Sequence, residues 1–390
     1  MVQYPAMEEI KDIKEIRKEI DGIDAQLASL IKRRLDIVGE VAEAKRKSGS
    51  PVSDPARERE IMTRVAEMVG PEYENGARLL FTTLFGIAKA RQRAMICGDC
   101  GVVSAIREAV AHAEAFPTRA VVACPGVEGS YAQQAASSLF PIPTILFFTS
   151  FEKVFEAVEK GLCPYGVLPV ENSAAGSVPQ VYDLMVSHRF HIVRSLRLKV
   201  DHVMLANRGA TLDGIREVAS HPHALTQCST FLKAHPSIKA VPAVNTAVAA
   251  KTLAAEGRTD TAVIASRACA DLYGLDVIAD GIADAAFNYT RFICISRKLE
   301  ITPDANKISI MLSLPHRPGA LNGIMARFSA IDVNLTKLES RPIPGMDFEF
   351  RFTFDFEASP ANRDVLALIA ELACDPEIEH FEFLGAYAER

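Results

Sequence analysis

A long stretch near the N-terminus constrains the fold of this chain more than any other feature. From about Glu8 to Lys47 the sequence predicts a single helix, because residues spaced three or four apart form one stripe along it. The stripe consists of Ile13, Arg17, Ile20, Asp24, Leu27, Ile31, Arg34, Val38, Val41 and Lys45. A helix of this length measures about 60 Å. It would extend beyond so small a domain unless a second copy packed along it, so the sequence predicts a dimer.

Three cations interrupt this mostly apolar stripe. Arg17, Arg34 and Lys45 lie on a face that we expect to be buried, and removing a charge from water is costly unless an opposite charge meets it. Asp24 can pair with only one or two of them. The cations therefore indicate an anionic ligand, with carboxylates, inside a helical bundle. The alternative is that the cations extend to solvent or form ion pairs between helices, and it remains open at this point.

Composition excludes several classes of protein. The net charge of −6 argues against a nucleic-acid partner. Cys97 and Cys100 form an isolated C-x-x-C pair without a second pair at zinc spacing, so we expect no structural metal and free thiols. No apolar run approaches the ~20 residues that span a bilayer, and the N-terminus lacks an apolar signal region. We therefore expect a cytoplasmic protein with no membrane partner.

The first quarter of the chain predicts an all-α domain. Residues 1–97 lack strand patterns and predict three helices, at about 8–47, 55–69 and 72–97, with Asp54 as the cap of the second. Residues 98–117 predict a linker, with a candidate helix at 102–115.

The middle region, 118–298, predicts two α/β lobes with mostly parallel strands, because short β-rich runs alternate with helical stretches. The predicted strands are 119–123, 144–148, 166–169, 203–206, 262–265 and 292–296, and helices are expected to begin at Ser130, Ser150, Thr211, Cys228 and Thr246.

The last region, 304–390, predicts a βαββαβ order, which is the ferredoxin-like α+β arrangement. Its clearest strand is 347–357, where phenylalanines alternate with polar residues. The other elements are expected at 307–314, 319–331, 333–339, 360–373 and 378–384.

Polar residues outside the stripe complete a candidate site in the first domain. Asp54, Arg57 and Glu58 share one face of the second helix, and Ala88 and Gln92 lie one turn apart on the third. A surface ion-pair cluster is the alternative for the first group. Together with the cations, these residues suit a dicarboxylate that carries a hydroxyl.

The segment from Ile16-Arg17 to Gln92 resembles the all-helical chorismate mutases, in Arg33-Arg34, Ala44-Lys45, Pro51-Val52-x-Asp54 and Arg57-Glu58. That family rearranges chorismate to prephenate by selecting a folded conformer and stabilising charge on the ether oxygen. The resemblance implies carboxylate binding by Arg34 and by Arg17 of a second copy, donation to the ether oxygen by Lys45 and Gln92, binding of the ring hydroxyl by Glu58, and nearby roles for Asp54 and Arg57. Ala88 stands where the family often has Ser, so we expect weaker binding.

Four polar segments stand out in the middle region. They are Gly126-x-x-Gly129-Ser130-Tyr131, Pro169-Val170-Glu171-Asn172-Ser173, Ser220-His221-Pro222 with Gln227-Cys228, and Asn288-Tyr289-Thr290-Arg291-Phe292. Polar residues at the carboxyl ends of strands are where α/β sheets place ligands. Each segment alone is also compatible with a turn or a helix cap.

Together the four segments resemble prephenate dehydratase over 119–298. Such an enzyme removes the ring hydroxyl and ring carboxylate of prephenate together, without a metal or cofactor. The resemblance implies that Thr290 donates a proton to the leaving hydroxyl or positions it, that Arg291 pairs with a carboxylate, and that Glu171 orients the site or moves a proton. The residues implied in positioning the substrate are Asn172, Ser173, Ser220, Gln227 and Thr246.

The last region resembles an ACT domain over about 305–388, through two motifs. The motifs are Gly319-Ala320-Leu321, after Pro315-His316-Arg317-Pro318, and Glu339-Ser340-Arg341-Pro342. In the ACT domains of prephenate dehydratases such segments line a site for L-phenylalanine between paired domains, so the resemblance implies feedback inhibition.

The three resemblances together imply a bifunctional enzyme, a dimer or tetramer, that converts chorismate to prephenate and prephenate to phenylpyruvate under control of L-phenylalanine. Two alternatives remain open. The second domain could act on arogenate, or the chain could be a non-catalytic binding protein that senses an amino acid.

Overall fold

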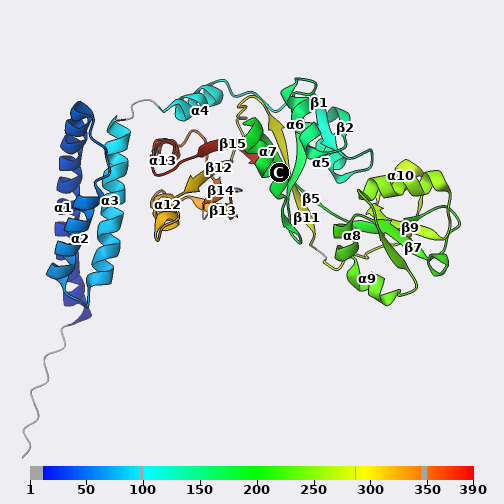
Figure 1. Cartoon of the computed structure of the whole chain (residues 1–390), viewed down its shortest axis with the longest axis horizontal. Helices are drawn as coiled ribbons and strands as arrows, with labels where there is room; N and C mark the ends of the chain where they lie inside the picture. The colour runs from blue at the N-terminus through cyan, green and yellow to red at the C-terminus, as the bar shows by residue number, and fades with distance from the viewer. Residues whose placement is uncertain (1–11, 97–99, 286, 344–348) are drawn as a thin grey trace, which may run out of the picture. The chain divides into compact units, whose positions relative to one another are not determined.

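The computed structural model describes residues 12–96, 100–285, 287–343 and 349–390 (Figure 1). These residues divide into two compact units. Unit 1 contains the described part of Met1–Cys100 together with Arg317–Ser329 and Ala367–Ile378. Unit 2 contains Gly101–His316 together with the described part of Ala330–Leu366 and Glu379–Arg390.

Three helices in unit 1 confirm the prediction for the first domain: α1 (Ile13–Ser48), α2 (Pro55–Val69) and α3 (Glu74–Ile96). They lie side by side in Figure 1. Gly49 ends α1 with a φ of 68°, a left-handed conformation that glycine adopts without strain. Asp54 caps α2 as predicted, since its carboxylate accepts a hydrogen bond from the backbone N–H of Arg57 at 3.0 Å. The predicted start of α1 at Glu8 lies outside the described residues.

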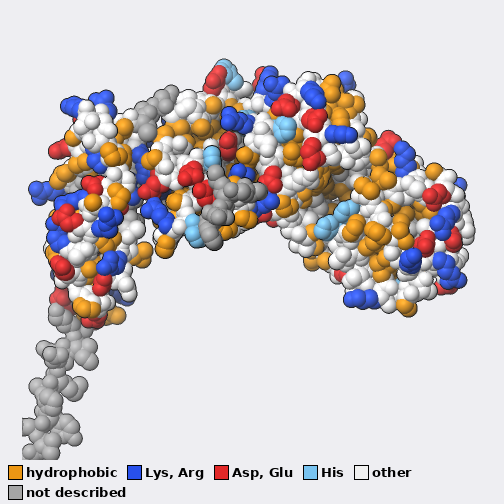
Figure 2. Space-filling model, in the orientation of Figure 1, with side chains coloured by type: hydrophobic (Ala, Val, Ile, Leu, Met, Phe, Trp, Pro, Cys, Tyr) orange, Lys and Arg blue, Asp and Glu red, His pale blue; other side chains and the backbone are white. Residues whose placement is uncertain are grey.

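Within one copy of the chain the stripe on α1 is largely exposed, so its burial against a second copy stays a prediction. Ile13, Ile20 and Leu27 are 61%, 50% and 45% exposed, whereas Arg34 and Lys45 are half-buried. The reason is length, because α1 has 36 residues and α3 only 23, a difference of about 20 Å. Figure 2 shows apolar side chains among the charged ones on the visible face of this bundle.

Unit 2 contains a ten-stranded sheet with the strand order β13-β14-β12-β15-β5-β11-β3-β1-β2, and β4 pairs with β3. The strands of its dehydratase part are β1 (Arg119–Pro125), β2 (Ile142–Phe148), β3 (Tyr165–Asn172), β4 (Gly176–Ser177), β5 (His191–Lys199) and β11 (Tyr289–Ser296). Alternate residues of β1 enter different cores: Val122 and Cys124 pack with α5 (Tyr131–Leu139), and Ala123 with α6 (Phe151–Glu159) and α7 (Pro179–His188). We call this part the first lobe.

A separate five-stranded sheet, with the order β10-β6-β9-β7-β8, forms the second lobe. Its strands are β6 (His202–Ala206), β7 (Glu217–Ser220), β8 (Lys239–Pro242), β9 (Thr261–Ser266) and β10 (Asp276–Ala279). Its helices are α8 (Pro222–Gln227), α9 (Ser229–Ala234), α10 (Thr246–Glu256) and α11 (Ala268–Tyr273). At Thr211 the expected helix is only the single 3₁₀ turn η1 (Leu212–Gly214).

Both lobes are mixed rather than mostly parallel, which corrects a second expectation. β1 pairs in parallel with β2 and β3, but β11 runs antiparallel to β3 and to β5. β6 likewise runs antiparallel to β9 and β10. The reason is connectivity, because β11 is the strand by which the chain returns from the second lobe to the first.

The C-terminal region follows the predicted βαββαβ order. Its elements are β12 (Lys307–Leu314), α12 (Ala320–Ala330), β13 (Asn334–Pro342), β14 (Phe350–Glu357), α13 (Arg363–Ala373) and β15 (Phe381–Glu389). Phe348, in the predicted strand, lies outside the described residues. β15 also pairs in parallel with β5, through Ala388 and Glu389, so these strands continue the sheet of the first lobe.

Helix α4 (Gly101–Ala111) lies in the predicted linker. No helix in the described ranges has both the length and the apolar composition required to cross a membrane. The seven cysteines that the structure describes are all free thiols, and Cys97 lies outside the described residues.

Candidate active sites

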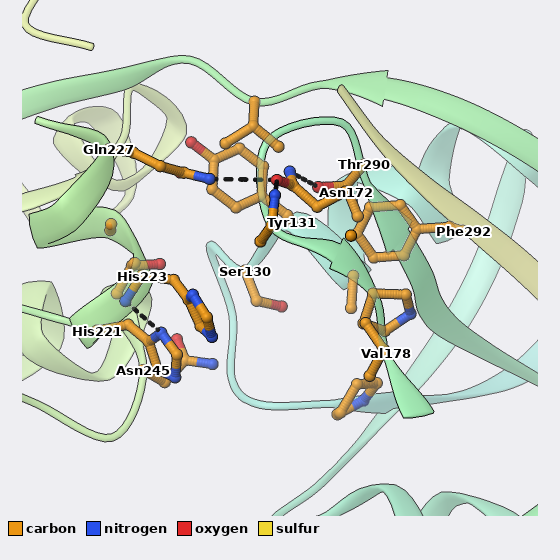
Figure 3. Close-up of a pocket in the computed structure, with 18 of the residues that line it drawn as sticks. Ser130, Tyr131, Asn172, Val178, His221, His223, Gln227, Asn245, Thr290 and Phe292 are labelled. Atoms are coloured by element: carbon orange, nitrogen blue, oxygen red, sulfur yellow. Dashed lines mark hydrogen bonds between the residues drawn. The ribbon is translucent and has the colours of Figure 1, made fainter. Parts of the chain in front are cut away.

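A cavity of about 430 Å³ in unit 2 is lined by both lobes (Figure 3). Four of the predicted residues line it: Asn172 at the end of β3, Thr290 on β11, Gln227 at the end of α8 and Thr246 at the start of α10. The two strands place their polar residues together because Thr290 pairs directly with Asn172 in the antiparallel register.

Backbone hydrogen bonds fix the orientation of the Asn172 amide. Its Oδ1 accepts hydrogen bonds from the backbone N–H groups of Ala174 and Ala175, at 3.0 and 2.9 Å. Its Nδ2 therefore faces the other way and donates to Oγ1 of Thr290 at 2.9 Å and to Oδ1 of Asn288 at 2.8 Å. Since the Thr290 oxygen accepts this bond, its own hydrogen remains available to a ligand in the cavity.

A chain of hydrogen bonds continues from Asn172 into the second lobe. Gln227 donates from Nε2 to Oδ1 of Asn172 at 3.2 Å, so its Oε1 faces Nε2 of His202 at 2.9 Å. His202 must then carry its hydrogen on Nε2, and its Nδ1 lies 3.2 Å from the hydroxyl of Tyr131. Burial lowers the pKa of His202, although Gln227 and Asp201 oppose the shift, so the ring is neutral at neutral pH.

Two predicted residues lie on the other face of the sheet, which corrects their assignment to this cavity. Successive residues of a strand point to opposite faces. Glu171 precedes Asn172 and Arg291 follows Thr290, so both point away from the cavity that their neighbours line. Arg291 instead forms a buried ion pair with Asp355 of β14.

Ser173 and Ser220 do not line the cavity either. The hydroxyl of Ser173 donates to the carbonyl of Phe287 at 3.3 Å and accepts from the N–H of Tyr289 at 3.0 Å, which ties two loops together. The hydroxyl of Ser220 is fully buried and donates to the carbonyl of Ile264 at 2.5 Å. Both hydroxyls are thus used within the protein.

The cavity wall carries no fixed charge, since none of the described residues that line it is Lys, Arg, Asp or Glu. Four helices of the two lobes begin at this wall, at Tyr131, Phe151, Pro179 and Thr246. Their N-terminal N–H groups and dipoles favour anions. His221 and His223, whose rings stack at 5.3 Å, also line it.

Sequence reasoning did not select Tyr131, His202, His223 or Asn245 as members of the site, although all four line it. Tyr131 lay inside a recognised motif without an assigned role, and His223 lies between Pro222 and Gln227 of another. His202 and Asn245 carried no motif. Only their positions at the start of β6 and directly before α10, facing the first lobe, could have indicated them.

In unit 1 a buried face of α3 carries Gln92, and a cation of the stripe contacts the same helix. Leu84, Ala88 and Gln92 are spaced one turn apart and are 8%, 6% and 6% exposed. Arg34 of α1 donates to the carbonyl of Leu84 at 3.3 Å and lies 5.8 Å from the ring centre of Phe85. The Oε1 atom of Gln92 has no hydrogen-bonding partner among the residues that the structure describes. A buried oxygen without a hydrogen-bonding partner marks a place for a polar ligand.

The other predicted residues of unit 1 lie around this bundle. Lys45 donates to the carbonyl of Val52 at 2.7 Å, and Glu58 forms an ion pair with Lys89 at 3.2 Å. Arg57 pairs with Glu60 at 2.6 Å, with both side chains more than half exposed. Arg57 therefore takes part in the surface pair that the sequence left open as an alternative. Arg17 is exposed.

The predicted effector motifs lie in different units. Gly319, in unit 1, adopts a φ of 83° directly before α12, which begins with Ala320 and Leu321. Glu339, Ser340, Arg341 and Pro342 end β13 in unit 2. Glu339 accepts a hydrogen bond from Ser177 of β4 at 2.5 Å, and Arg341 donates to the carbonyl of Pro179 at 2.9 Å. Ser177 and Pro179 also line the cavity, so this motif contacts the cavity wall.

Two family models match the chain. The model described as Prephenate dehydratase matches residues 122–300, and the model described as Chorismate mutase type II matches residues 16–93. The first match covers both lobes from residue 122 onward and includes Thr290, and the second covers α2 and most of α1 and α3.

Individual proteins are similar to this chain as well. Arogenate dehydratase/prephenate dehydratase 2 of Arabidopsis thaliana, named as chloroplastic, is 40% identical over 63% of this chain and 67% of its own length. The bifunctional chorismate mutase/prephenate dehydratase of Escherichia coli is 28% identical over 92% of both chains. The crystal structure of prephenate dehydratase from Arthrobacter aurescens with L-Phe has a TM-score of 0.62 and 28% identity, covering 69% of this chain and 89% of that chain. This chain therefore belongs to the prephenate dehydratase family, as a bifunctional member with a type II chorismate mutase domain ahead of its dehydratase domain.

Proposed function

We propose that the chain catalyses two successive reactions, from chorismate to prephenate and from prephenate to phenylpyruvate, water and carbon dioxide. The observation that carries the second reaction is the fixed orientation of Asn172, which leaves the Thr290 hydroxyl free to donate into an uncharged cavity.

In the dehydratase reaction the ring C–O bond and the bond from the ring to its carboxylate break, and the freed electron pair completes the aromatic ring. Thr290 donates a hydrogen bond to the leaving hydroxyl. A threonine hydroxyl is a weak acid, so the net proton comes from solvent and Thr290 orients the group that receives it. The uncharged wall favours loss of a charged carboxylate as neutral carbon dioxide.

The carboxylates of prephenate are held without lysine or arginine from the described wall. The starts of α5, α7 and α10 provide N–H groups, and the rings of His221 and His223 line the same wall. This assignment replaces the carboxylate-binding role that the resemblance implied for Arg291.

In the mutase reaction no group of the protein needs to exchange a proton with chorismate. Arg34 binds a carboxylate, and Lys45 and the Gln92 amide stabilise charge on the ether oxygen. The buried, unpartnered Oε1 of Gln92 and the contact of Arg34 with the same helix, at Leu84, support this assignment. Glu58 binds the ring hydroxyl, with Asp54 nearby.

A second copy completes the mutase site. The exposed apolar residues of α1, among them Ile13, Ile20 and Leu27, are covered when two α1 helices pack together. The same packing brings Arg17 of each copy to the bundle of the other. The active form is therefore a homo-oligomer, a dimer or a larger assembly of dimers.

The βαββαβ region is an ACT domain, and L-phenylalanine is its effector. The Arthrobacter aurescens prephenate dehydratase structure is described as a complex with L-Phe, and the contacts of Glu339 and Arg341 with the cavity wall give such a ligand a direct route to the site. The seven free cysteines support a reducing, cytoplasmic location.

Arogenate is the second candidate substrate, because the Arabidopsis thaliana relative is named for both activities. Arogenate carries an ammonium group where prephenate carries a ketone. The described cavity wall offers no carboxylate to an ammonium group, which favours prephenate. A comparison of kcat/KM on the two substrates decides, and a strong preference for arogenate contradicts the proposal.

Thr290→Ala tests the assignment of the two sites. The variant should lose phenylpyruvate formation and still form prephenate from chorismate at the rate of the unmodified protein. Undiminished phenylpyruvate formation, or the absence of both activities from the unmodified protein, contradicts the proposed function. In the second case an amino-acid-sensing role would be the better account.

A further inference from the structure

Arg291 lies directly after Thr290 on β11 but takes part in a different set of interactions. In the pairing of β11 with β3, Thr290 stands opposite Asn172 and Arg291 opposite Glu171, and the register shifts immediately after Arg291. Such irregularities fix the direction of side chains beside active sites. Any displacement of the Arg291 backbone therefore changes the position of the Thr290 hydroxyl.

The guanidinium of Arg291 is buried among residues of the C-terminal region. It forms an ion pair with Asp355 of β14, with side-chain exposures of 7% and 2%. Its Nη2 donates to the hydroxyl of Tyr387 on β15 at 2.6 Å, and its Nε lies 2.9 Å from Glu389 on the same strand. The first lobe contributes the hydroxyl of Ser195 on β5, which accepts from Nε at 3.0 Å.

A second layer of hydrogen bonds fixes Asp355. Ser309 of β12 donates to its carboxylate, and the Tyr387 hydroxyl lies 2.6 Å from the Ser309 hydroxyl. Burial raises the pKa of Tyr387, so this hydroxyl keeps its hydrogen and donates it to Ser309. Three strands of the βαββαβ region, β12, β14 and β15, thus hold one guanidinium that extends from β11.

Because both charges are buried, the ion pair between Arg291 and Asp355 joins β11 rigidly to the C-terminal strands. A buried ion is stable only with its partner, so an arrangement that separates Asp355 from Arg291 is strongly disfavoured. The sheet is also continuous, because β15 pairs with β5 and β5 pairs with β11. β11 and the C-terminal strands therefore move together.

We propose that Arg291 is a positioning residue of the dehydratase site. Through its ion pair with Asp355, the βαββαβ region holds Thr290 where its hydroxyl can donate a hydrogen bond to the leaving hydroxyl of the substrate. The proposal rests on the proposed dehydratase function. Arg291 touches no substrate and acts through Thr290.

The test replaces both ions together, by Arg291→Met with Asp355→Leu in the full chain. Exchanging a buried pair for apolar side chains leaves no unpaired charge between these two positions, and Glu389 keeps Lys307 at 2.6 Å and Arg197 at 3.1 Å. With prephenate as substrate, kcat should fall about tenfold or more while KM stays within about twofold, since Thr290 is needed in the transition state. Mutase activity and the thermal unfolding midpoint should not change.

Asp375→Asn is the matched control. Asp375 belongs to the same C-terminal region and is 4% exposed, but its partners are Arg93 and Arg327 rather than Arg291. Its kcat on prephenate should equal that of the unmodified protein. If the double variant fails to fold, Tyr387→Phe, which removes one hydroxyl from the same arrangement, should lower kcat in the same direction with KM unchanged.

Unchanged kcat in a folded variant overturns the proposal. This result differs from a failure of the proposed dehydratase function, because in that case the unmodified protein would not convert prephenate at all.

Discussion

Asn172 donates a hydrogen bond from its side-chain amide to the hydroxyl of Thr290, at 2.9 Å, across the pair of strands that carries both residues. The direction of this bond is set by two backbone N–H groups that hold the amide oxygen. The bond therefore decides which way the Thr290 hydrogen points, and with it what Thr290 offers to a substrate.

Asn172→Asp reverses that direction. A carboxylate accepts but does not donate, so the Thr290 hydrogen turns toward it and away from the cavity. We expect kcat on prephenate to fall about 100-fold or more, the usual size of a lost proton donor. The control is Asn207→Asp, which also removes an amide that donates two bonds, to the carbonyls of Leu253 and Arg258, but outside the cavity. Equal losses in the two variants would contradict the assignment.

Arg34→Ala should selectively damage the mutase reaction. Arg34 is half-buried against Leu84 and Phe85, so its loss removes a positioned cation from the bundle. We expect a loss of about 3–5 kcal/mol in transition-state stabilisation, by analogy with breaking a buried ion pair. The exposed neighbour Arg33, changed to Ala, is the control and should retain its rate. An unchanged rate in Arg34→Ala refutes the interpretation of the α1 stripe.

The buried neutral His202 gives the protein a pH-dependent stability. Its folded pKa is lowered by burial from the usual 6.5, so the unfolded chain takes up a proton first as the pH falls. The stabilisation is complete above about pH 6.5 and is lost as the pH falls from there toward the folded pKa. His202→Gln keeps a hydrogen-bond donor for Gln227. As the pH falls from about 6.5 toward the folded pKa of His202, this variant should lose less stability than the unmodified protein. Urea unfolding at several pH values measures the free energy of unfolding. If it depends on pH equally in both proteins, this prediction is contradicted.

Asp183→Asn should alter control by L-phenylalanine. Asp183 of α7 forms an ion pair at 3.1 Å with Arg341, which belongs to the predicted effector motif. Asp183 itself does not line the cavity. If the effector competes for Arg341, removing this partner lets L-phenylalanine inhibit at lower concentration. The shift should be up to about fivefold, because an exposed ion pair contributes ~1 kcal/mol at most. Asp213→Asn, at an exposed position of the second lobe, is the control, and weaker or unchanged inhibition in Asp183→Asn contradicts the model.

The sequence predicted most elements because their signals are local. Asp54 marked the start of α2, and the alternating phenylalanines marked β14. The resemblance to prephenate dehydratase also implied one site for Asn172, Gln227, Thr246 and Thr290, and all four line the cavity.

What the sequence did not reveal depends on pairing between distant strands. Glu171 and Arg291 belong to the same motifs as Asn172 and Thr290, yet a strand directs neighbours to opposite faces. The partner of Arg291 is 64 residues away, and no local pattern links Arg291 to Asp355. The exposure of the α1 stripe depends on helix lengths and on a second copy, and neither is a property of the stripe itself.

The central claim is that one chain carries out both reactions in sequence. The direct measurement supplies the purified full chain with chorismate alone and follows prephenate and phenylpyruvate over time, with and without L-phenylalanine. The account predicts that prephenate appears first, that phenylpyruvate follows, and that L-phenylalanine slows the second step. Chorismate that remains unconverted, or prephenate that accumulates without forming phenylpyruvate, would contradict it.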